Sequence, residues 1–281
     1  MPSRNINACL PSLNINKLHD LTMPIKLIIR QQFHVFFLGL IMLLLPITAL
    51  AGQATDQAGN ELVNAAGRGQ LSRIKSLLAE SRPFDQSTLN QALIQATTNG
   101  QDKIVEFLLD TGADIDATSI GENRSLLHLA TRDDRIDVVR VLLAKGAKKD
   151  AISVDGTTAL MIAAQYHRIE ILRLLIQAGT DIDASNQEGV TALMYAAQLN
   201  FQNGVQDLLR AGANVNKMTN SGATALMLAA QNGYQNVTRT LLAAGADPDI
   251  KAGNEATALL LAQKYNHRDV IKILLNAGAR Q

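Results

Sequence analysis

The phrase TALMIAA, residues 158–164, returns as TALMYAA at 191–197, TALMLAA at 224–230 and TALLLAQ at 257–263. The interval between successive copies is constant, and a weaker version, SLLHLAT, stands one interval earlier at 125–131. The threonine that opens each strong copy precedes an apolar run, where its side-chain oxygen can accept a hydrogen bond from a free helix amide. The small alanine pair near the end gives the helix a thin face that neighbours can approach. The phrase therefore predicts a short, capped helix that repeats along the chain.

A second helix and a turn follow each phrase. Residues 169–175 are apolar at helical spacing, which predicts the second helix. The break between the two helices falls on residues that we expect in the left-handed conformation: His167, Asn200, Gly233 and Asn266. Glycines in the same register as the phrases end the second helices: Gly112, Gly146, Gly179, Gly212, Gly245 and Gly278. The polar stretch before the next phrase predicts a hairpin turn, and a general helical bundle would not keep six glycines in phase.

These phrases resemble the ankyrin repeat, which has a period of about 33 residues and whose first helix usually opens with T-P-L-H. The chain has alanine at the proline position, and only His128 keeps the histidine, which Met161, Met194, Met227 and Leu260 replace. The resemblance implies an all-α ankyrin-repeat solenoid of about seven helix–turn–helix units with hairpin turns, over residues 60–281. We expect the units at about 60–84, 85–117, 118–150, 151–183, 184–216, 217–249 and 250–281. The interval from Gly112 to Gly146 is one residue longer than the others, and the extra residue is expected in the 117–124 turn.

The first 51 residues have the pattern of an export signal. Lys26 and Arg30 precede an uninterrupted apolar run at 35–45, and Pro46 follows it. Ala49 and Ala51 then form the small-x-small pattern that signal peptidase recognises, so we expect cleavage after Ala51 and a linker at 52–59. The alternative is an uncleaved membrane anchor, although a spanning helix needs about 20 apolar residues.

Two details refine the leader. Residues 1–22 are polar, and Met23 offers a second start of translation beside Met1. Gln53 stands where a lipoprotein would need its lipid-bearing cysteine, which indicates a soluble mature protein. The first 51 residues hold four Lys or Arg and one Asp, so the remainder has 22 basic residues, 24 acidic residues and a formal charge of −2. That charge argues against nucleic acid as a partner.

We find no catalytic, cofactor or metal motif in the sequence. The only cysteine, Cys9, lies in the leader, so the repeats have no thiol for catalysis or metal binding. His128 is expected to make structural hydrogen bonds, and the other two histidines after the leader, His167 and His267, fall at helix-end turns on distant units. The recurring aspartates, such as Asp181 and Asp183, belong to the entry of the hairpins. We expect no enzyme activity, no cofactor and no metal.

The repeat also shows which residues are free to recognise a partner. Ankyrin-like solenoids bind through turn tips and the concave face lined by first helices, and the repeat does not determine the residues there. Exposed apolar residues and tyrosines on one face indicate a protein interface. The residues that this register predicts for partner binding are Ile152, Val154, Gln165, Tyr166, Val190, Gln198, Leu199, Met218, Gln231, Lys264 and Tyr265.

The leader and the repeat together predict an exported scaffold. We expect a periplasmic or secreted monomer that binds another protein, one version being a protective or immunity-type partner of an exported protein. The alternatives are an adaptor held in the inner membrane by an uncleaved leader, and a secreted effector. Only the anchored form would contact a membrane.

Overall fold

The structure is a computed structural model, and it describes residues 57–80 and 83–280. Contact between residues divides the chain into two units, of which the second runs from Ala58 to Gln281. The predicted leader, with Met23, Ala49 and Ala51, lies outside the described residues. The prediction of an all-α solenoid of about seven helix–turn–helix units is confirmed, because the described residues form seven helix pairs and no strand.

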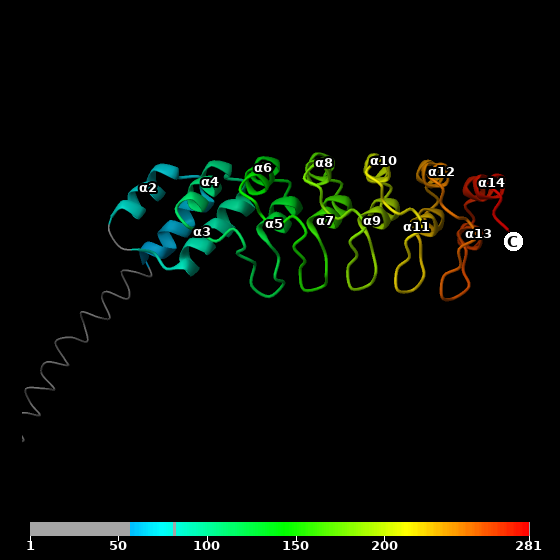
Figure 1. Cartoon of the computed structure of the whole chain (residues 1–281), viewed down its shortest axis with the longest axis horizontal. Helices are drawn as coiled ribbons and strands as arrows, with labels where there is room; N and C mark the ends of the chain where they lie inside the picture. Colours follow the sequence, from blue (N-terminus) through cyan, green and yellow to red (C-terminus); the bar gives the residue numbers. More distant parts are fainter. Residues whose placement is uncertain (1–56, 81–82, 281) are drawn as a thin grey trace, which may run out of the picture. The chain divides into compact units, whose positions relative to one another are not determined.

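The helix pairs follow one another in chain order (Figure 1). The first helices of the pairs are residues 57–67, α3 (Gln86–Asn99), α5 (Leu126–Arg132), α7 (Ala159–Gln165), α9 (Ala192–Gln198), α11 (Ala225–Gln231) and α13 (Ala258–Lys264). The second helices are α2 (Leu71–Ala79), α4 (Asp102–Asp110), α6 (Ile136–Ala144), α8 (Ile169–Gln177), α10 (Gln202–Arg210), α12 (Gln235–Ala243) and α14 (Arg268–Asn276). The loops before α5, α7, α9, α11 and α13 all project on the same side of the row (Figure 1).

The local predictions for each helix pair are confirmed. The side chains of Thr158, Thr191, Thr224 and Thr257 each accept a hydrogen bond from the amide three residues later, at 3.2–3.3 Å. The break between the helices is left-handed at His167, Asn200, Gly233 and Asn266, where φ lies between 57° and 75°. At the start of each of these first helices, the threonine side chain accepts a hydrogen bond from a backbone amide that has no partner within the helix. After the first helix, the chain reverses direction at a Gly, Asn or His residue.

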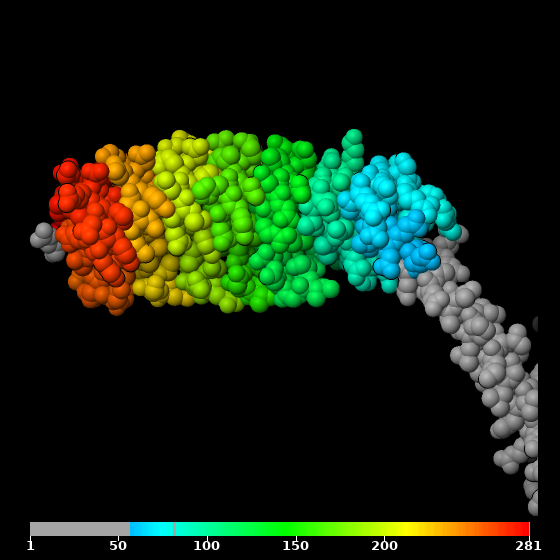
Figure 2. Space-filling model, turned by 180° about the vertical axis from the view of Figure 1, so that it is seen from behind, coloured from blue at the N-terminus to red at the C-terminus, as the bar shows by residue number. Residues whose placement is uncertain are grey.

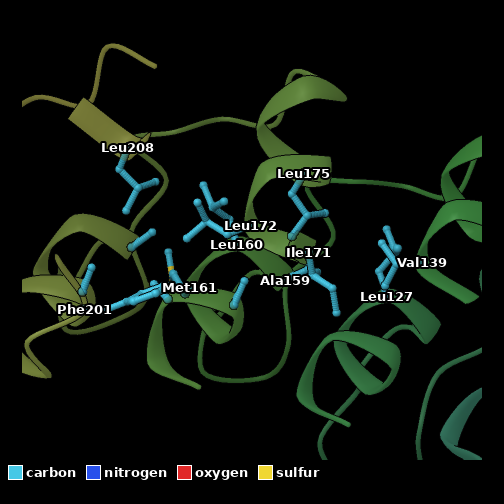
Figure 3. Packing of buried hydrophobic residues seen from close by; sticks show 14 of the residues in the cluster. Leu127, Val139, Ala159, Leu160, Met161, Ile171, Leu172, Leu175, Phe201 and Leu208 are labelled. Atoms are coloured by element: carbon cyan, nitrogen blue, oxygen red, sulfur yellow. The ribbon is translucent and has the colours of Figure 1, made fainter. Parts of the chain in front are cut away.

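The core lies between the helices of one pair and of the next. Ile171, Leu172 and Leu175 of α8 are fully buried and belong to one apolar cluster with Leu160 and Met161 of α7 (Figure 3). The alanine pairs, such as Ala163 and Ala164, are also fully buried, as the thin-face argument predicts. First helices pack on first helices and second helices on second helices of the neighbouring units. The main helix contacts of each unit are therefore with the adjacent units, and the units appear as consecutive colour bands in Figure 2. The stability of such an array is the sum of the stability of each unit and of the interfaces between neighbouring units.

Candidate protein-binding surface

The five loops that precede α5, α7, α9, α11 and α13 are called the hairpins here, at residues 118–125, 152–158, 185–191, 218–224 and 251–257. Each hairpin closes on itself, as where the Ser153 amide donates to the Thr157 carbonyl at 3.0 Å. Each of the last four also bonds to the hairpin before it through one backbone hydrogen bond. The amides of Val154, Gln187, Asn220 and Gly253 donate in turn to the carbonyls of Glu122, Asp155, Glu188 and Ser221, at 2.9–3.0 Å. The hairpin tips therefore form a connected surface.

One glycine shows how closely the hairpins approach each other. Gly189 has φ +79°, and a Cβ atom added there would lie 2.8 Å from the Asn220 amide nitrogen. Any other residue at this position would force the next hairpin to move and would strain the backbone. The tips are thus held by backbone contacts, while their outward side chains remain free to vary.

Paired aspartates and asparagines at the hairpin entries cap backbone amides. The Asp183 amide donates to the Asp181 carboxylate at 3.0 Å, and the Asp183 carboxylate accepts from the Asn214 amide of the next unit at 2.9 Å. The same link between units recurs from Asp150, Asn216 and Asp249. Within the described residues, no group of three His, Cys, Asp or Glu side chains could hold a metal ion. These acidic groups act as structural caps between units.

The three histidines of the repeats make separate structural contacts. His128 is fully buried, and its Nε2 lies 2.8 Å from the Thr157 carbonyl oxygen of the next hairpin. Burial lowers the pKa of His128 below its ordinary value of 6.5, partly opposed by the Thr157 hydrogen bond. The His167 ring stacks on Phe201 with centroids 4.7 Å apart, and His267 Nε2 lies 2.9 Å from the Gln231 carbonyl oxygen. The buried contact with the Thr157 carbonyl supports the structural hydrogen bonding that the sequence predicts for His128.

The predicted tip residues are exposed with one exception. Ile152, Val154 and Met218 are 60%, 61% and 51% exposed. Val190 is half-buried and packs against the core, so its assignment as an exposed tip residue is wrong. It directly precedes the cap Thr191, where the chain turns inward to begin α9. Ile120, missed by the sequence reasoning, is 95% exposed on the hairpin that holds the extra residue.

The predicted residues at the ends of the first helices are all exposed. Tyr166, Leu199 and Tyr265 occupy the same place in three units, at the C-terminal caps of α7, α9 and α13, and are 46%, 39% and 46% exposed. A glutamine or lysine precedes this position in each of four units: Gln165, Gln198, Gln231 and Lys264. The Lys264 ammonium lies 5.5 Å from the centre of the Tyr265 ring. This row presents large apolar or aromatic groups beside amides, a composition that protein interfaces favour.

The interior side of the hairpins holds one further polar contact. Asn186 donates from its side-chain amide to the hydroxyl of Tyr195 on α9 at 3.3 Å. Tyr195 is half-buried, and burial together with the nearby carboxylates of Asp155 and Glu188 raises its pKa. The phenol therefore remains neutral at physiological pH and ties the hairpin to the helix rather than serving as a base.

Comparisons with known proteins agree with the repeat. A family model described as ankyrin repeats in three copies matches residues 62–153, 93–186, 127–219 and 193–281. A crystal structure of an ankyrin-repeat domain from Acinetobacter baumannii has a TM-score of 0.63 and 32% identity, and covers 67% of this chain and 98% of that chain. The ankyrin-repeat domain of Bcl-3, an IκB family protein, has a TM-score of 0.68 and 31% identity, and covers 76% of this chain and 97% of that chain.

The curated relatives are longer proteins. The ankyrin-repeat and KH domain-containing protein mask-1 of Caenorhabditis elegans is 32% identical over 126 residues, which are 44% of this chain and 5% of that protein. The p105 subunit of nuclear factor NF-κB from Mus musculus is 34% identical over 117 residues, which are 39% of this chain and 12% of that protein. The chain thus spans less than a fifth of the length of the curated relatives that it matches.

Proposed function

The chain belongs to the ankyrin-repeat family, and on that premise we propose that it is a scaffold that binds one other protein through its hairpin tips and its first-helix face. Ankyrin repeats generally bind proteins, and the scaffold is typically non-catalytic. The observation that carries the proposal is the exposure of large side chains at both places: Tyr166, Leu199 and Tyr265 at the helix ends, and Ile152 and Val154 at the hairpin tips. Large side chains held on a rigid scaffold lose little conformational freedom on binding, which favours affinity.

The proposed place of action is outside the cytoplasm, and the sequence of the leader supports it. The basic residues, the apolar run at 35–45 and the Ala49–Ala51 pattern support export and a periplasmic or secreted scaffold. In the described residues, no helix has both the length and the apolar character to cross a membrane. A protective or immunity-type partner of an exported protein is one form that this function would take. An uncleaved leader would instead make the chain a membrane-anchored adaptor, and release into a host would make it an effector.

Affinity capture from the periplasm tests the binding surface. The wild-type chain and a Tyr166→Asp, Leu199→Asp double variant would serve as baits, and captured proteins would be identified by mass spectrometry. We expect one dominant partner that the double variant fails to retain, because two carboxylates would be desolvated in the interface. The control bait carries Asn203→Asp and Leu275→Asp, which add the same charge at exposed positions on α10 and α14.

The outcomes separate binding from folding and localisation. Equal retention by the double variant and the control would overturn the proposed surface, provided both show wild-type helical circular dichroism. The localisation is tested apart from binding, by N-terminal sequencing of the exported chain and by carbonate washing of membranes. A mature N-terminus at Gly52 supports cleavage, whereas a chain that resists the wash and starts at Met1 or Met23 supports the anchored form.

A further inference from the structure

The hairpin before α5 differs from the other four because it holds the extra residue. Its Ser119 amide donates to the Arg124 carbonyl across five positions at 2.9 Å. In the next hairpin the equivalent bond joins Ser153 to Thr157, four positions apart, and the remaining three hairpins repeat that spacing. The wider turn has left-handed backbone at both Gly121 and Asn123. The junction between this hairpin and the next is therefore the irregular one in the row.

A pocket of about 140 Å³ opens at this junction. Its lining is mixed. The apolar part comes from Ile115, Leu126, Leu127, Ala147, Ala151 and Ile152, and Thr118, Asn123 and Ser125 contribute uncharged polar groups. Pockets for small-molecule ligands usually enclose about 300–1,000 Å³, so this pocket is too small for a cofactor. Its size suits one side chain, and its apolar residues suit an aliphatic one. Anchor residues of protein partners are commonly received in pockets of this kind.

The charged groups at the pocket neutralise each other. Asp116 and Lys148 both line it, and the Lys148 ammonium lies 2.7 Å from the Asp116 carboxylate. At the later junctions an acidic or amide side chain in the position of Asp116 caps a backbone amide of the next unit. Here the Asp116 carboxylate pairs with a side chain instead. A charged side chain entering the pocket would lose its hydration, and it would find no unpaired group of opposite charge there. The pocket therefore favours an uncharged side chain.

Exposed apolar side chains concentrate on the same two hairpins. Ile120, Ile152 and Val154 are three of the nine large apolar side chains that are exposed in the described residues. The two hairpins are held together by the bond from the Val154 amide to the Glu122 carbonyl at 3.0 Å. Of these three residues, Ile152 lines the pocket, so an apolar side chain bound there would contact Ile152 directly. Ile120 and Val154 lie on the same two hairpins and could contact other parts of the partner.

We propose that the pocket between the hairpins before α5 and α7 receives an aliphatic side chain of the partner protein, of about the size of leucine. This inference rests on the proposed function and adds to it the chemistry of the anchor. It assigns the strongest single contact to a junction of two hairpins rather than to the tyrosines at the helix ends.

The pocket can be tested without knowing the partner. The probe is N-acetyl-leucine amide, compared with N-acetyl-lysine amide and N-acetyl-aspartate amide, titrated into the full-length chain with labelled isoleucine methyl groups. We expect saturable shifts at Ile115 and Ile152 with leucine amide, in roughly the millimolar range for so small a ligand. The two charged amides should give at least tenfold smaller affinity. Equal shifts with all three amides, or no saturable shift, would overturn the proposal.

Two variants and a matched control assign the shifts to the pocket. Ala151→Leu places a leucine side chain in the pocket and should abolish the shifts. Deletion of Gly121 restores the regular spacing of the repeat and should do the same by closing the wide turn. Ala184→Leu makes the first change at the equivalent position of the next unit, a regular junction, and should leave the shifts as in the wild type. Persistence of the shifts in a folded Ala151→Leu or Gly121-deleted chain would show that the probe binds elsewhere.

The pocket and the proposed function can fail separately. Once capture identifies a partner, Ala151→Leu should weaken its affinity by roughly tenfold or more, while Ala184→Leu leaves it unchanged. A partner lost only in the Tyr166→Asp, Leu199→Asp variant would keep the scaffold function and reject the pocket as its anchor. Failure of every variant to change capture would reject both.

Discussion

The unit that contains His128 and the three methionine units after it hold the next hairpin in different ways. His128 Nε2 lies 2.8 Å from the carbonyl oxygen of Thr157, and its Nδ1 lies 2.6 Å from the hydroxyl of Ser125. In the later units Met161, Met194 and Met227 occupy the same position at 1–2% exposure. One unit therefore uses buried hydrogen bonds where the others use apolar packing.

The comparison of the two kinds of unit shows that the hairpins do not depend on the histidine for their shape. The Thr157 carbonyl also accepts from the Ser153 amide at 3.0 Å, and the Val190 carbonyl accepts from the Asn186 amide at 3.1 Å. Each hairpin is thus closed by its own backbone, whichever residue the preceding helix presents. A net hydrogen bond contributes about 0.5–1.5 kcal/mol and a buried methionine about 1.5–3 kcal/mol, so the two solutions are comparable.

The largest effect is expected where methionine packing is removed. Met194→Ala should lower the free energy of unfolding by about 2–4 kcal/mol, because it leaves a cavity between two units. Urea denaturation followed by circular dichroism measures the change. Leu260→Ala is the matched control, since Leu260 has the same place in its unit but is 47% exposed. A cost for Leu260→Ala equal to that of Met194→Ala would contradict the idea that burial by the next unit makes the difference.

Converting the histidine unit into a methionine unit should cost less. His128→Met loses the contacts to Ser125 and Thr157 but retains a side chain of similar reach in an apolar place. We expect the free energy of unfolding at pH 8 to fall by about 1–2 kcal/mol, which corresponds to the lost hydrogen bonds. A loss above that measured for Met194→Ala would show that the histidine holds more than its own unit. Hydrogen exchange at the Thr157 hairpin would then locate the additional opening.

The two kinds of unit should also respond differently to pH. Because burial lowers the pKa of His128 below 6.5, the unfolded chain binds a proton more readily than the folded chain does. Stability from this group is complete above pH 6.5 and declines as the pH falls toward the lowered pKa of the folded state. The difference in unfolding free energy between the wild type and His128→Met should therefore shrink from pH 8 to pH 5. A constant difference across that range would contradict a neutral, buried His128.

Local chemistry explains how much of the fold the sequence reveals. The capping threonines, the left-handed residues at the helix breaks and the buried alanine pairs are set within one unit, so their repetition alone identifies them. The surface is less predictable, because exposure depends on what the neighbouring unit covers. Leu275 is 44% exposed on α14, while Leu242, at the same place on α12, packs against the core.

The two errors on the hairpins have separate causes. Val190 corresponds to Thr157, Ala223 and Ala256 in three other units and to Arg124 in the irregular one. The small residues in the three regular units were a sign that the position faces inward. Ile120 follows Ser119 as Val154 follows Ser153, but it lies in the turn with the extra residue. Counting back one regular interval from Val154 therefore gives Gly121 instead of Ile120. An irregular spacing indicates where the surface departs from the repeat, but not which side chain will be exposed or what pocket will open.

The smallest change is expected when a histidine enters a methionine unit. In Met161→His the new ring would stand one unit after His128, with Thr158 in the place of Ser125 and the Val190 carbonyl in the place of the Thr157 carbonyl. The hydrogen bonds gained would offset the apolar burial lost, so the free energy of unfolding at pH 8 should change by less than about 1 kcal/mol.

The Met161→His variant should also lose stability between pH 6.5 and pH 5 more steeply than the wild type, because it holds two buried neutral histidines in place of one. Urea denaturation at both pH values measures the two effects together. A loss at pH 8 as large as that of Met194→Ala would mean that the hairpin before α9 cannot offer its carbonyl, and that methionine and histidine units are not interchangeable.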